Sequence, residues 1–314
     1  MLSITTSGRR VRLIYIAITV VLLPLFFVGG PDWTSGPLFK AAWNLGHIIF
    51  FALLMLAVQP QQWFSGWRLW LVVSAVVIVV GVAIEWLQGN VGRQSDWHDI
   101  FRNLIGTWLA LAWMKRPSPN TRKAITRWVL RITAVVLLVV ELKAVADVAQ
   151  LQYRINHQLP TLYDFSATEP LLFWRGNVHR TREHVSGDDF SLRIDLGTNF
   201  YAGAALDNLP EDWREYDMLQ VALYNPGSTP LEMTLRINDV VHDRSKSSYS
   251  DRYNTRLPLE PGLNRFRIPL DEVRNAPKSR TMDMHEIRRL VIFTTQLKQP
   301  RQIFLLQLAL DRSN

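Results

Sequence analysis

The stretch from Ile84 to Ala110, IEWLQGNVGRQSDWHDIFRNLIGTWLA, places polar and ionisable side chains between two apolar runs. Its polar members are Glu85, Gln88, Arg93, Asp96, Asp99, Arg102 and Asn103. A charged group at the centre of a bilayer costs about 2.5–3.5 kcal/mol on insertion scales, so charged groups in membrane helices are rare and usually functional. The stretch therefore predicts a helical hairpin that closes one polar pocket.

The second half of this stretch carries a single polar and small face. Asp96, Asp99 and Asn103 are three or four residues apart, and Gly106 and Ala110 continue the same face of a helix. Small residues allow the backbones of neighbouring membrane helices to approach closely. This face is therefore predicted to be acidic where it begins and in close helix contact further along.

Polar residues recur here at fixed offsets, Glu85-x2-Gln88-x4-Arg93-x5-Asp99-x3-Asn103-x2-Gly106. With His47 upstream, this pattern resembles the VanZ-like family of membrane proteins over roughly residues 10 to 115. The family usually has Lys three residues before its His, where this chain has Asn44. The resemblance implies a helical membrane domain, a set of site residues and a link to resistance against the glycopeptide teicoplanin. It implies no particular reaction.

Apolar runs of spanning length predict a membrane α-helical bundle of about five transmembrane helices. The first four lie at residues 13–30, 39–58, 69–88 and 97–114, within a membrane domain of residues 1–115. A basic loop at 116–127 leads to the fifth, at 128–148. Arg131, Glu141 and Lys143 interrupt this fifth run, so an interfacial amphipathic helix is the alternative there. Glu141 is expected to face the bundle.

The distribution of basic residues predicts the orientation of the bundle. Arg9, Arg10 and Arg12 precede the first span, and five further Lys and Arg residues fill the stretch from 115 to 127. Cytoplasmic loops carry such an excess, so the N-terminus is predicted to be cytoplasmic in a bacterial inner membrane. Five spans then place the C-terminal half in the periplasm or outside the cell, and the polar stretch near the outer leaflet.

Composition narrows the classes of function. The chain has 314 residues with 35 Lys and Arg against 27 Asp and Glu, a net charge of +8. Much of this excess flanks the apolar helices, and no aromatic–basic platform accompanies it, so nucleic acid is not an expected partner. The chain has no cysteine, which excludes disulfides, Cys-ligated metals and thiol catalysis.

From about Leu171 the apolar pattern changes to period two, which is typical of strands. The strand-like segments, separated by turn signals, are FSLRIDL, MLQVALYN, LEMTLRIND, NRFRIPL, RRLVIFTT and QIFLLQLAL. Strands at this spacing predict an all-β antiparallel sandwich over residues 166–314, after a linker or continuing helix at 149–165.

The order of these elements resembles jelly-roll carbohydrate-binding domains of the galactose-binding-like type. Trp213 and Tyr216 precede a strand, Tyr-Asn-Pro-Gly stands at 224–227, and Tyr249 opens a later polar loop. The resemblance implies that the domain binds polysaccharide, with Trp213, Tyr216 and Tyr249 stacking on sugar rings. The alternative is that these aromatic residues fill the core of a structural or protein-binding domain.

The polar stretch supplies the candidate catalytic residues. Glu85, Asp99 and His47 are predicted to orient a substrate or transfer protons. Arg93 is predicted to clamp an anionic group, because a guanidinium binds phosphate with two parallel hydrogen bonds. The remaining candidate substrate contacts are Gln88, Asn103, Asp96 and Asn44.

Each of these residues also has a structural interpretation. Asp96 is a typical helix N-cap, Asp99 and Glu85 suit fixed interhelical bonds, and Arg93 suits a solvated loop. His47, Glu85 and Asp99 could ligate a metal by residue type, but no HExxH-type spacing accompanies them, so no metal or other cofactor is predicted.

These observations lead to two hypotheses. In the first, the chain is a cell-envelope membrane protein whose outer-leaflet pocket binds an anionic lipid or lipid-linked glycan headgroup, and whose β-sandwich binds polysaccharide. It would act in envelope polysaccharide metabolism or in glycopeptide resistance. In the second, the chain is a non-enzymatic membrane-anchored scaffold that binds glycan or protein, and its buried polar residues only join the helices. A small transporter is disfavoured, because no polar stripe crosses the membrane.

Overall fold

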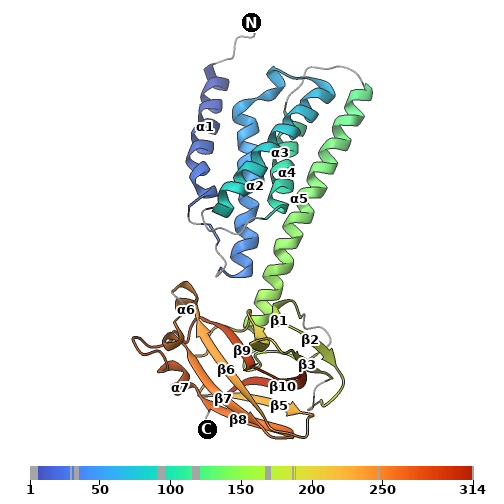
Figure 1. Cartoon of the computed structure of the whole chain (residues 1–314). Helices are drawn as coiled ribbons and strands as arrows, with labels where there is room; N and C mark the ends of the chain where they lie inside the picture. Colours follow the sequence, from blue (N-terminus) through green and yellow to red (C-terminus); the bar gives the residue numbers. More distant parts are fainter. Residues whose placement is uncertain are drawn as a thin grey trace. The chain divides into compact units, whose positions relative to one another are not determined.

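The computed structural model describes residues 6–28, 30–31, 35–90, 96–114, 121–166, 171–185, 187, 189–245 and 248–312. The chain divides into two compact units, Met1–Gln150 and Leu151–Asn314 (Figure 1). Helices build the first unit and antiparallel strands build the second. The helical N-terminal region and the β-sandwich that the sequence predicts are both confirmed.

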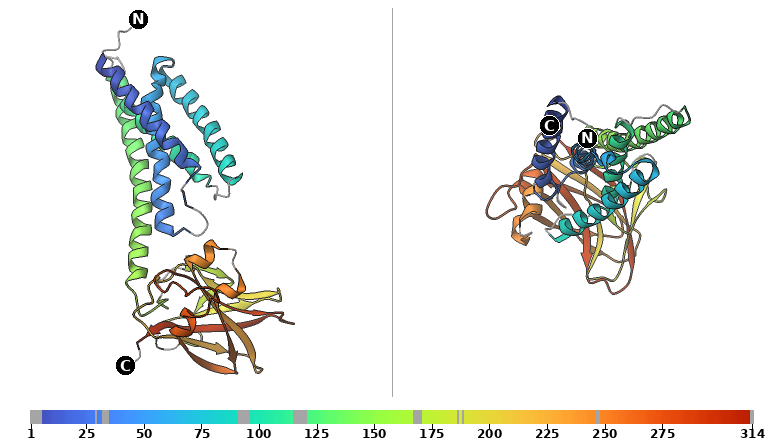
Figure 2. Two further views of the ribbon diagram at one scale, coloured as in Figure 1. Left: turned by 90° about the vertical axis from the view of Figure 1, so that its left-hand side faces the viewer. Right: turned by 90° about the horizontal axis from the view of Figure 1, so that it is seen from above.

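The first unit is a bundle of helices that run side by side (Figures 1 and 2). Its elements are α1 (Thr6–Leu22), η1 (Leu23–Phe26), α2 (Pro37–Val58), η2 (Pro60–Gln62), α3 (Gly66–Asn90), α4 (His98–Trp113) and α5 (Thr121–Asn156). α1 gives way to a 3-10 turn at Pro24, whose ring cannot continue an α-helix without a clash. α2 ends where Gln59 takes a left-handed conformation before Pro60.

Two segments, not five, are long and apolar enough to cross a membrane in the part of the chain that the structure describes. They are Pro37–Gln62 and Gly66–Gly89. In the most apolar 18-residue stretch of each segment, only 33% is buried inside the protein. α1 has 17 described residues and α4 has 16, which is short of a full span. α5 is longer at both ends than the predicted 128–148, and it carries Arg131, Glu141 and Lys143.

α2 and α4 pack closely at a glycine. A Cβ added to Gly106 would lie 2.2 Å from the carbonyl oxygen of Ile48, so the two backbones are in direct contact. The predicted close helix contact on this face of α4 is therefore confirmed. A small apolar core around Phe51, Leu69 and Leu111 packs beneath the polar residues of the same helices.

The second unit is a sandwich of two five-stranded antiparallel sheets. The first sheet has the order β1 (Trp174–Gly176), β4 (Tyr201–Leu206), β9 (Ile287–Thr295), β6 (Leu231–Asp239) and β7 (Tyr253–Leu259). The second sheet has the order β2 (Val178–Thr181), β3 (Ser191–Leu196), β10 (Arg301–Asp311), β5 (Met218–Asn225) and β8 (Gly262–Pro269). Short helical turns join them: η3 (Leu171–Phe173), α6 (Val240–Arg244), η4 (Tyr249–Asp251) and α7 (Leu270–Arg274).

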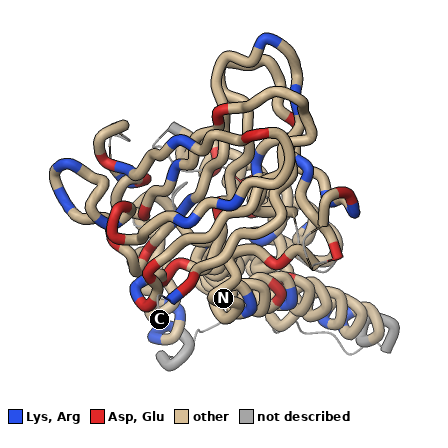
Figure 3. Tube along the Cα trace, turned by 90° about the horizontal axis from the view of Figure 1, so that it is seen from below, with Lys and Arg blue, Asp and Glu red and all other residues tan. Residues whose placement is uncertain are grey.

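The alternating apolar side chains of both sheets meet in one core. Trp213 and Ile292 lie fully buried within it, and Leu162 adds a residue from the segment before η3. On the outside, Lys and Arg residues are interspersed with Asp and Glu residues along the loops and strands (Figure 3). The charges of this unit therefore pair locally, as in the contact of Arg214 with Asp212 at 2.7 Å.

Candidate functional site

Three of the predicted site residues meet inside the helical unit. His47 comes from α2, Glu85 from α3 and Asp99 from α4, and all three are buried. One potential ligand atom from each lies within 4.8 Å of the others. His47 Nε2 and Asp99 Oδ2 are 3.4 Å apart. The three residues predicted to be catalytic therefore lie together, and we call them and the groups bonded to them, Asp96, Arg102, Asn103 and Glu141, the helical cluster.

Neighbouring groups fix these three side chains. His47 Nδ1 lies 2.9 Å from Asn103 Oδ1, so the ring orientation depends on an amide one helix away. The backbone N–H of Asp96 donates to Glu85 Oε2 at 2.8 Å. The edge of the Phe26 ring packs against the imidazole, with 4.7 Å between ring centroids.

Arg102 links the cluster to α5. Its guanidinium donates to Asp99 at 2.5 Å, to Asp96 at 3.2 Å and to Glu141 at 2.9 Å. His98 Nε2 lies 2.7 Å from Glu141 as well. Glu141 thus faces the bundle, as its position in an apolar run predicted.

Most of the predicted substrate contacts form hydrogen bonds to other parts of the protein. Gln88 donates to the backbone carbonyl of Phe26 at 2.7 Å, which joins α3 to η1. Asp96 Oδ1 accepts the backbone N–H of His98, the first residue of α4, at 2.9 Å. With its amide turned to satisfy both ends, Asn44 accepts a bond from Arg102 at 3.2 Å. Arg93 lies outside the described residues.

Sequence reasoning missed the residue that connects this cluster. Arg102 was considered only as a possible ion-pair partner of Glu85, and His98 was not singled out. The signal was present, because Arg102 follows Asp99 by three residues and therefore shares its helix face. The partner on α5, Glu141, could be matched to Arg102 only once the fold was known.

The residues predicted to stack on glycan are not brought together. The prediction that Trp213 stacks on a sugar is wrong. Its side chain is 0% exposed, and its ring N–H donates to the carbonyl of Pro210 at 2.7 Å. A ring in the core cannot stack on a sugar. Tyr216 is half-buried against the core with Arg312 over its ring, whereas Tyr249 is 71% exposed on η4.

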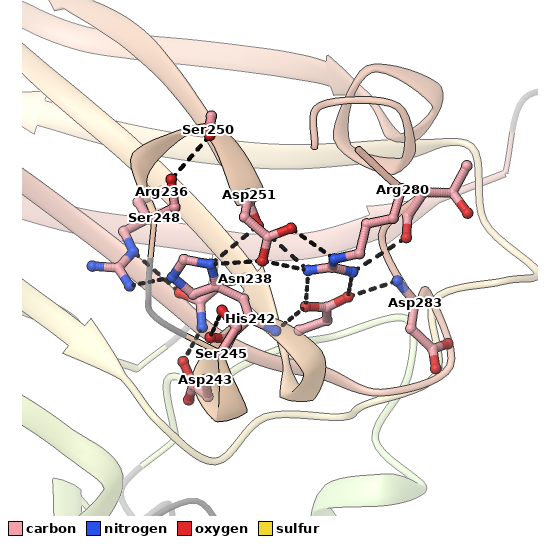
Figure 4. A network of polar contacts seen from close by, with 12 residues as sticks. Arg236, Asn238, His242, Asp243, Ser245, Ser248, Ser250, Asp251, Arg280 and Asp283 are labelled. Carbon is pink, nitrogen blue, oxygen red and sulfur yellow. Dashed lines mark hydrogen bonds and ion pairs between the residues drawn. The ribbon is translucent and has the colours of Figure 1, made fainter. Parts of the chain in front are cut away.

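A buried polar network joins α6, η4 and the segment before β9 (Figure 4). Arg280 lies between two carboxylates and donates to Asp239 at 2.8 Å and to Asp251 at 2.7 Å. These hydrogen bonds raise the pKa of Arg280 and hold the pKa of Asp251 below its usual range. The backbone N–H of Asp283 donates to Asp239 as well, so the network fastens three segments.

His242 lies in the same network between Asp251 and Arg236. Its Nδ1 is 3.3 Å from Asp251 Oδ2, and its Nε2 is 3.3 Å from Arg236 Nη2. Burial lowers the pKa of His242, and the adjacent Arg236 lowers it further. Burial also lowers the pKa of Arg236 to about 10. We call this set of residues the β-network.

The outward face of the second sheet carries aromatic and polar side chains that sequence reasoning did not select. His184 stacks on Tyr224 with ring centroids 3.8 Å apart, and it meets the ring of Phe304 edge-on at 4.6 Å. Beside them, Gln307 donates to Gln220 at 3.2 Å, and Gln220 donates to Asp311 at 2.7 Å.

A cavity adjoins the same strand, β10. Its volume is about 420 Å³, and it is bounded by Leu306, Gln307 and Ala309 on β10 and by Thr161 and other residues of the segment 158–165. The main chain of Leu162 donates to Leu308 and that of Leu310 donates to Pro160, which holds the segment beside β10. We call the His184–Tyr224 pair, the Gln220–Gln307–Asp311 row and this cavity the outward face.

No family model matches the chain, and no curated protein matches it. The VanZ-like resemblance of residues 10–115 therefore remains a prediction. Solved structures similar to the chain include a family 11 carbohydrate-binding module from Clostridium thermocellum that is complexed with a mixed-linked tetrasaccharide. Its identity is 13%, the match covers 49% of this chain and 95% of the module, and the TM-score is 0.38.

Two enzymes show the same level of likeness. An agarase matches at 16% identity over 49% of this chain and 26% of its own, with a TM-score of 0.37. A xylanase fragment from Clostridium thermocellum, complexed with xylohexaose, matches at 8% identity over 49% and 28%, with a TM-score of 0.34. These likenesses are too distant to add to the sandwich topology, which the strand pairing establishes by itself.

Proposed function

We propose that this chain is a membrane-anchored glycan-binding protein of the cell envelope, and that the outward face of the second sheet holds the glycan. The observation that carries this proposal is the exposed His184 ring stacked on Tyr224 beside a row of amide and carboxylate groups. Sugar rings have apolar faces that pack on aromatic rings and hydroxyls that pair with planar polar groups. The adjoining cavity is lined by polar groups such as Gln158, Asp164 and Gln307, which suit the hydroxyls of a sugar.

Binding of soluble glycans to the full chain in detergent tests this proposal. Tyr224→Ala and Gln307→Ala are expected to weaken binding at least tenfold, because they remove the stacking ring and the centre of the polar row. The matched control is Tyr249→Ala, which removes an exposed ring on η4, before β7 of the other sheet, and is expected to leave binding unchanged. Loss of binding in Tyr249→Ala alone would favour the residues selected from sequence and overturn the proposal.

We propose further that the helical unit crosses a bacterial inner membrane, with its N-terminus in the cytoplasm and the β-sandwich outside. Two apolar segments support this, because most of their apolar surface is not covered by protein. Arg12 donates to the carbonyl of Ala57 at the end of α2, and Arg131 donates to that of Ala112 near the end of α4. Basic side chains thus gather at one end of the helices, which the positive-inside rule assigns to the cytoplasm.

The orientation can be measured directly, because the chain has no cysteine. Single cysteines at Ser250 in the β-sandwich and at Ser65 before α3 should react with an impermeant maleimide differently in intact cells. Ser250→Cys is expected to be labelled from outside, and Ser65→Cys only after the membrane is permeabilised. The reverse pattern would contradict the proposed orientation.

A second proposed role belongs to the helical cluster, where a histidine and two carboxylates from three helices converge. Buried ionisable groups of this kind suit the recognition of an anionic lipid or lipid-linked headgroup, with Glu85 or Asp99 moving a proton. Native mass spectrometry of the chain with anionic phospholipid tests it. Glu85→Gln and Asp99→Asn should abolish retained lipid at unchanged protein level, and equal loss of protein would make these residues structural.

A further inference from the structure

We infer that His47, Glu85 and Asp99 bind a divalent transition-metal ion, with Zn²⁺ as the best-fitting occupant. Histidine nitrogen together with carboxylate oxygen is a donor set that Zn²⁺ and its neighbours accept readily. The three residues come from three different helices, so the spacing of a single-helix metal motif is absent from the sequence. The inference rests on where the fold places the atoms, and it does not depend on glycan binding.

The separation of the donor atoms fits a metal. Two ligands at about 2.1 Å from a tetrahedral ion lie about 3.4 Å apart. His47 Nε2 and Asp99 Oδ2 are 3.4 Å apart. The third ligand, a carboxylate oxygen of Glu85, lies within 4.8 Å of both, so closing the site requires a movement of little more than about an ångström. Glu85 has three side-chain torsions with which to make it.

The groups behind the three donors are arranged as in metal sites. A metal-bound histidine usually donates its other ring N–H to an oxygen, which fixes the tautomer. His47 Nδ1 lies 2.9 Å from Asn103 Oδ1 and leaves Nε2 toward the carboxylates. Asp99 is held through Oδ1 by Arg102, and Glu85 is held through Oε2 by the backbone of Asp96. Each ligand is thus oriented through one polar atom, His47 through Nδ1, Asp99 through Oδ1 and Glu85 through Oε2.

Charge favours a cation at this place. Arg102 is shared by Asp96, Asp99 and Glu141, so its single positive charge cannot neutralise all three. Glu85 adds a fourth carboxylate that is only 2% exposed. Taking carboxylates out of water is costly unless they are paired or bind a metal. A divalent ion between Glu85 and Asp99 adds positive charge beside two buried carboxylates, and its fourth position can take water or an anionic oxygen.

The test uses the full chain, purified in detergent and loaded with Zn²⁺ or Co²⁺. We expect about one equivalent of Zn²⁺ per chain by plasma mass spectrometry, and a visible Co²⁺ absorption band that excess Zn²⁺ removes. His47→Ala should lower bound metal at least tenfold. Glu141→Gln is the matched control, because it changes a buried carboxylate of the same cluster outside the three ligands, and it should retain the metal.

A further variant locates the ion even if His47→Ala does not fold. In His47→Cys, a thiolate replaces the imidazole, and Co²⁺ should produce a near-ultraviolet charge-transfer band that can arise only at position 47. The inference would be overturned if the wild-type chain held no more Zn²⁺ than the background level, or if a folded His47→Ala protein bound as much metal as the wild type. Loss of glycan binding alone would not bear on it, because the two sites belong to separate units.

Discussion

The two buried polar assemblies of this protein differ in how their charges are balanced. In the β-network, Arg280 lies between Asp239 and Asp251, and Arg289 pairs with Asp243 at 3.4 Å. Arg236 bonds to Asn238 at 3.1 Å and lies against His242. In the helical cluster, three carboxylates share the single guanidinium of Arg102, and Glu85 lies beside them. Among the described residues, the cation Arg280 thus lies between two carboxylates in one assembly, whereas the cation Arg102 is shared by three carboxylates in the other.

This difference indicates that the β-network has a structural role and that the helical cluster is a candidate functional site. A balanced network needs no ligand, because each buried charge already has an opposite charge or a hydrogen bond. The β-network also fastens loops that the strands alone would not hold, since Arg280 and Asp239 are 41 residues apart in sequence. In the helical cluster one guanidinium serves three carboxylates, so a bound cation can add to the positive charge there. The helical cluster is therefore the better candidate for chemistry.

Removing the central cation of the β-network should have the largest effect on stability. Arg280→Met would leave the fully buried Asp239 without its partner, which costs about 3–5 kcal/mol of unfolding free energy. The measurement is denaturant unfolding of the full chain, with hydrogen exchange in β6 and β7 to assign the loss to this unit. Arg214→Met is the control, because that arginine pairs with Asp212 on the surface, and it should cause no measurable change.

A small loss in Arg280→Met would mean that the β-network is not the balanced, structural assembly described above. The comparison would then fail, because charge balance would no longer distinguish a structural network from a functional site.

The helical cluster depends instead on how closely α2 and α4 approach. Gly106→Ala would place a methyl group 2.2 Å from the carbonyl oxygen of Ile48, so the helices must separate. We expect a loss of about 1–3 kcal/mol, typical of overpacking, and a weaker contact between His47 and Asn103. Gly46→Ala is the matched control on α2, since nothing lies within 4 Å of an added Cβ there. Thermal unfolding in detergent compares the two variants, and equal midpoints would show that the close approach is not required.

The sequence predicted much of the fold because local pattern carried it. The apolar alternation of MLQVALYN and LEMTLRIND gives β5 and β6 with the same ends as in the structure. β4 was missed because most side chains of the run YAGAAL are small and give no apolar alternation. In the structure this strand packs tightly, since a Cβ added to Gly203 would lie 2.2 Å from the carbonyl oxygen of Ile292. β7 was missed because YNTRLPL contains polar residues and a proline. Both strands depend on their neighbours in the sheet.

The candidate sites also differ in how far the sequence predicted them. The convergence of His47, Glu85 and Asp99 followed from hydropathy and charge, because each residue is an ionisable group inside an apolar run. The outward face did not follow, because Tyr224 and Gln307 lie on strands whose register and facing side are set by pairing. Trp213 was misassigned for the related reason that an aromatic residue before a strand gives no sign of whether it points into the core.

The smallest predicted effect is a pH dependence of stability that arises in the β-network. Burial lowers the pKa of His242, so the folded unit binds a proton there less readily than the unfolded chain. Its contribution to stability is present above about pH 6.5 and is lost as the pH falls through the folded pKa. The unfolding free energy should therefore decline below pH 6.5 by at most about 1.4 kcal/mol per pH unit. Asp251, whose pKa is lowered by Arg280, extends the decline below about pH 4.

Denaturant unfolding between pH 7 and pH 5 measures this slope, followed through hydrogen exchange in α6 and η4. His242→Gln keeps a polar side chain without the titration and should flatten the curve in that interval. The matched control is His179→Gln, at an exposed histidine on β2, which should leave the slope unchanged. A slope that survives in His242→Gln would place the acid sensitivity outside the β-network, and proton uptake would then cease to distinguish the balanced assembly from the helical cluster.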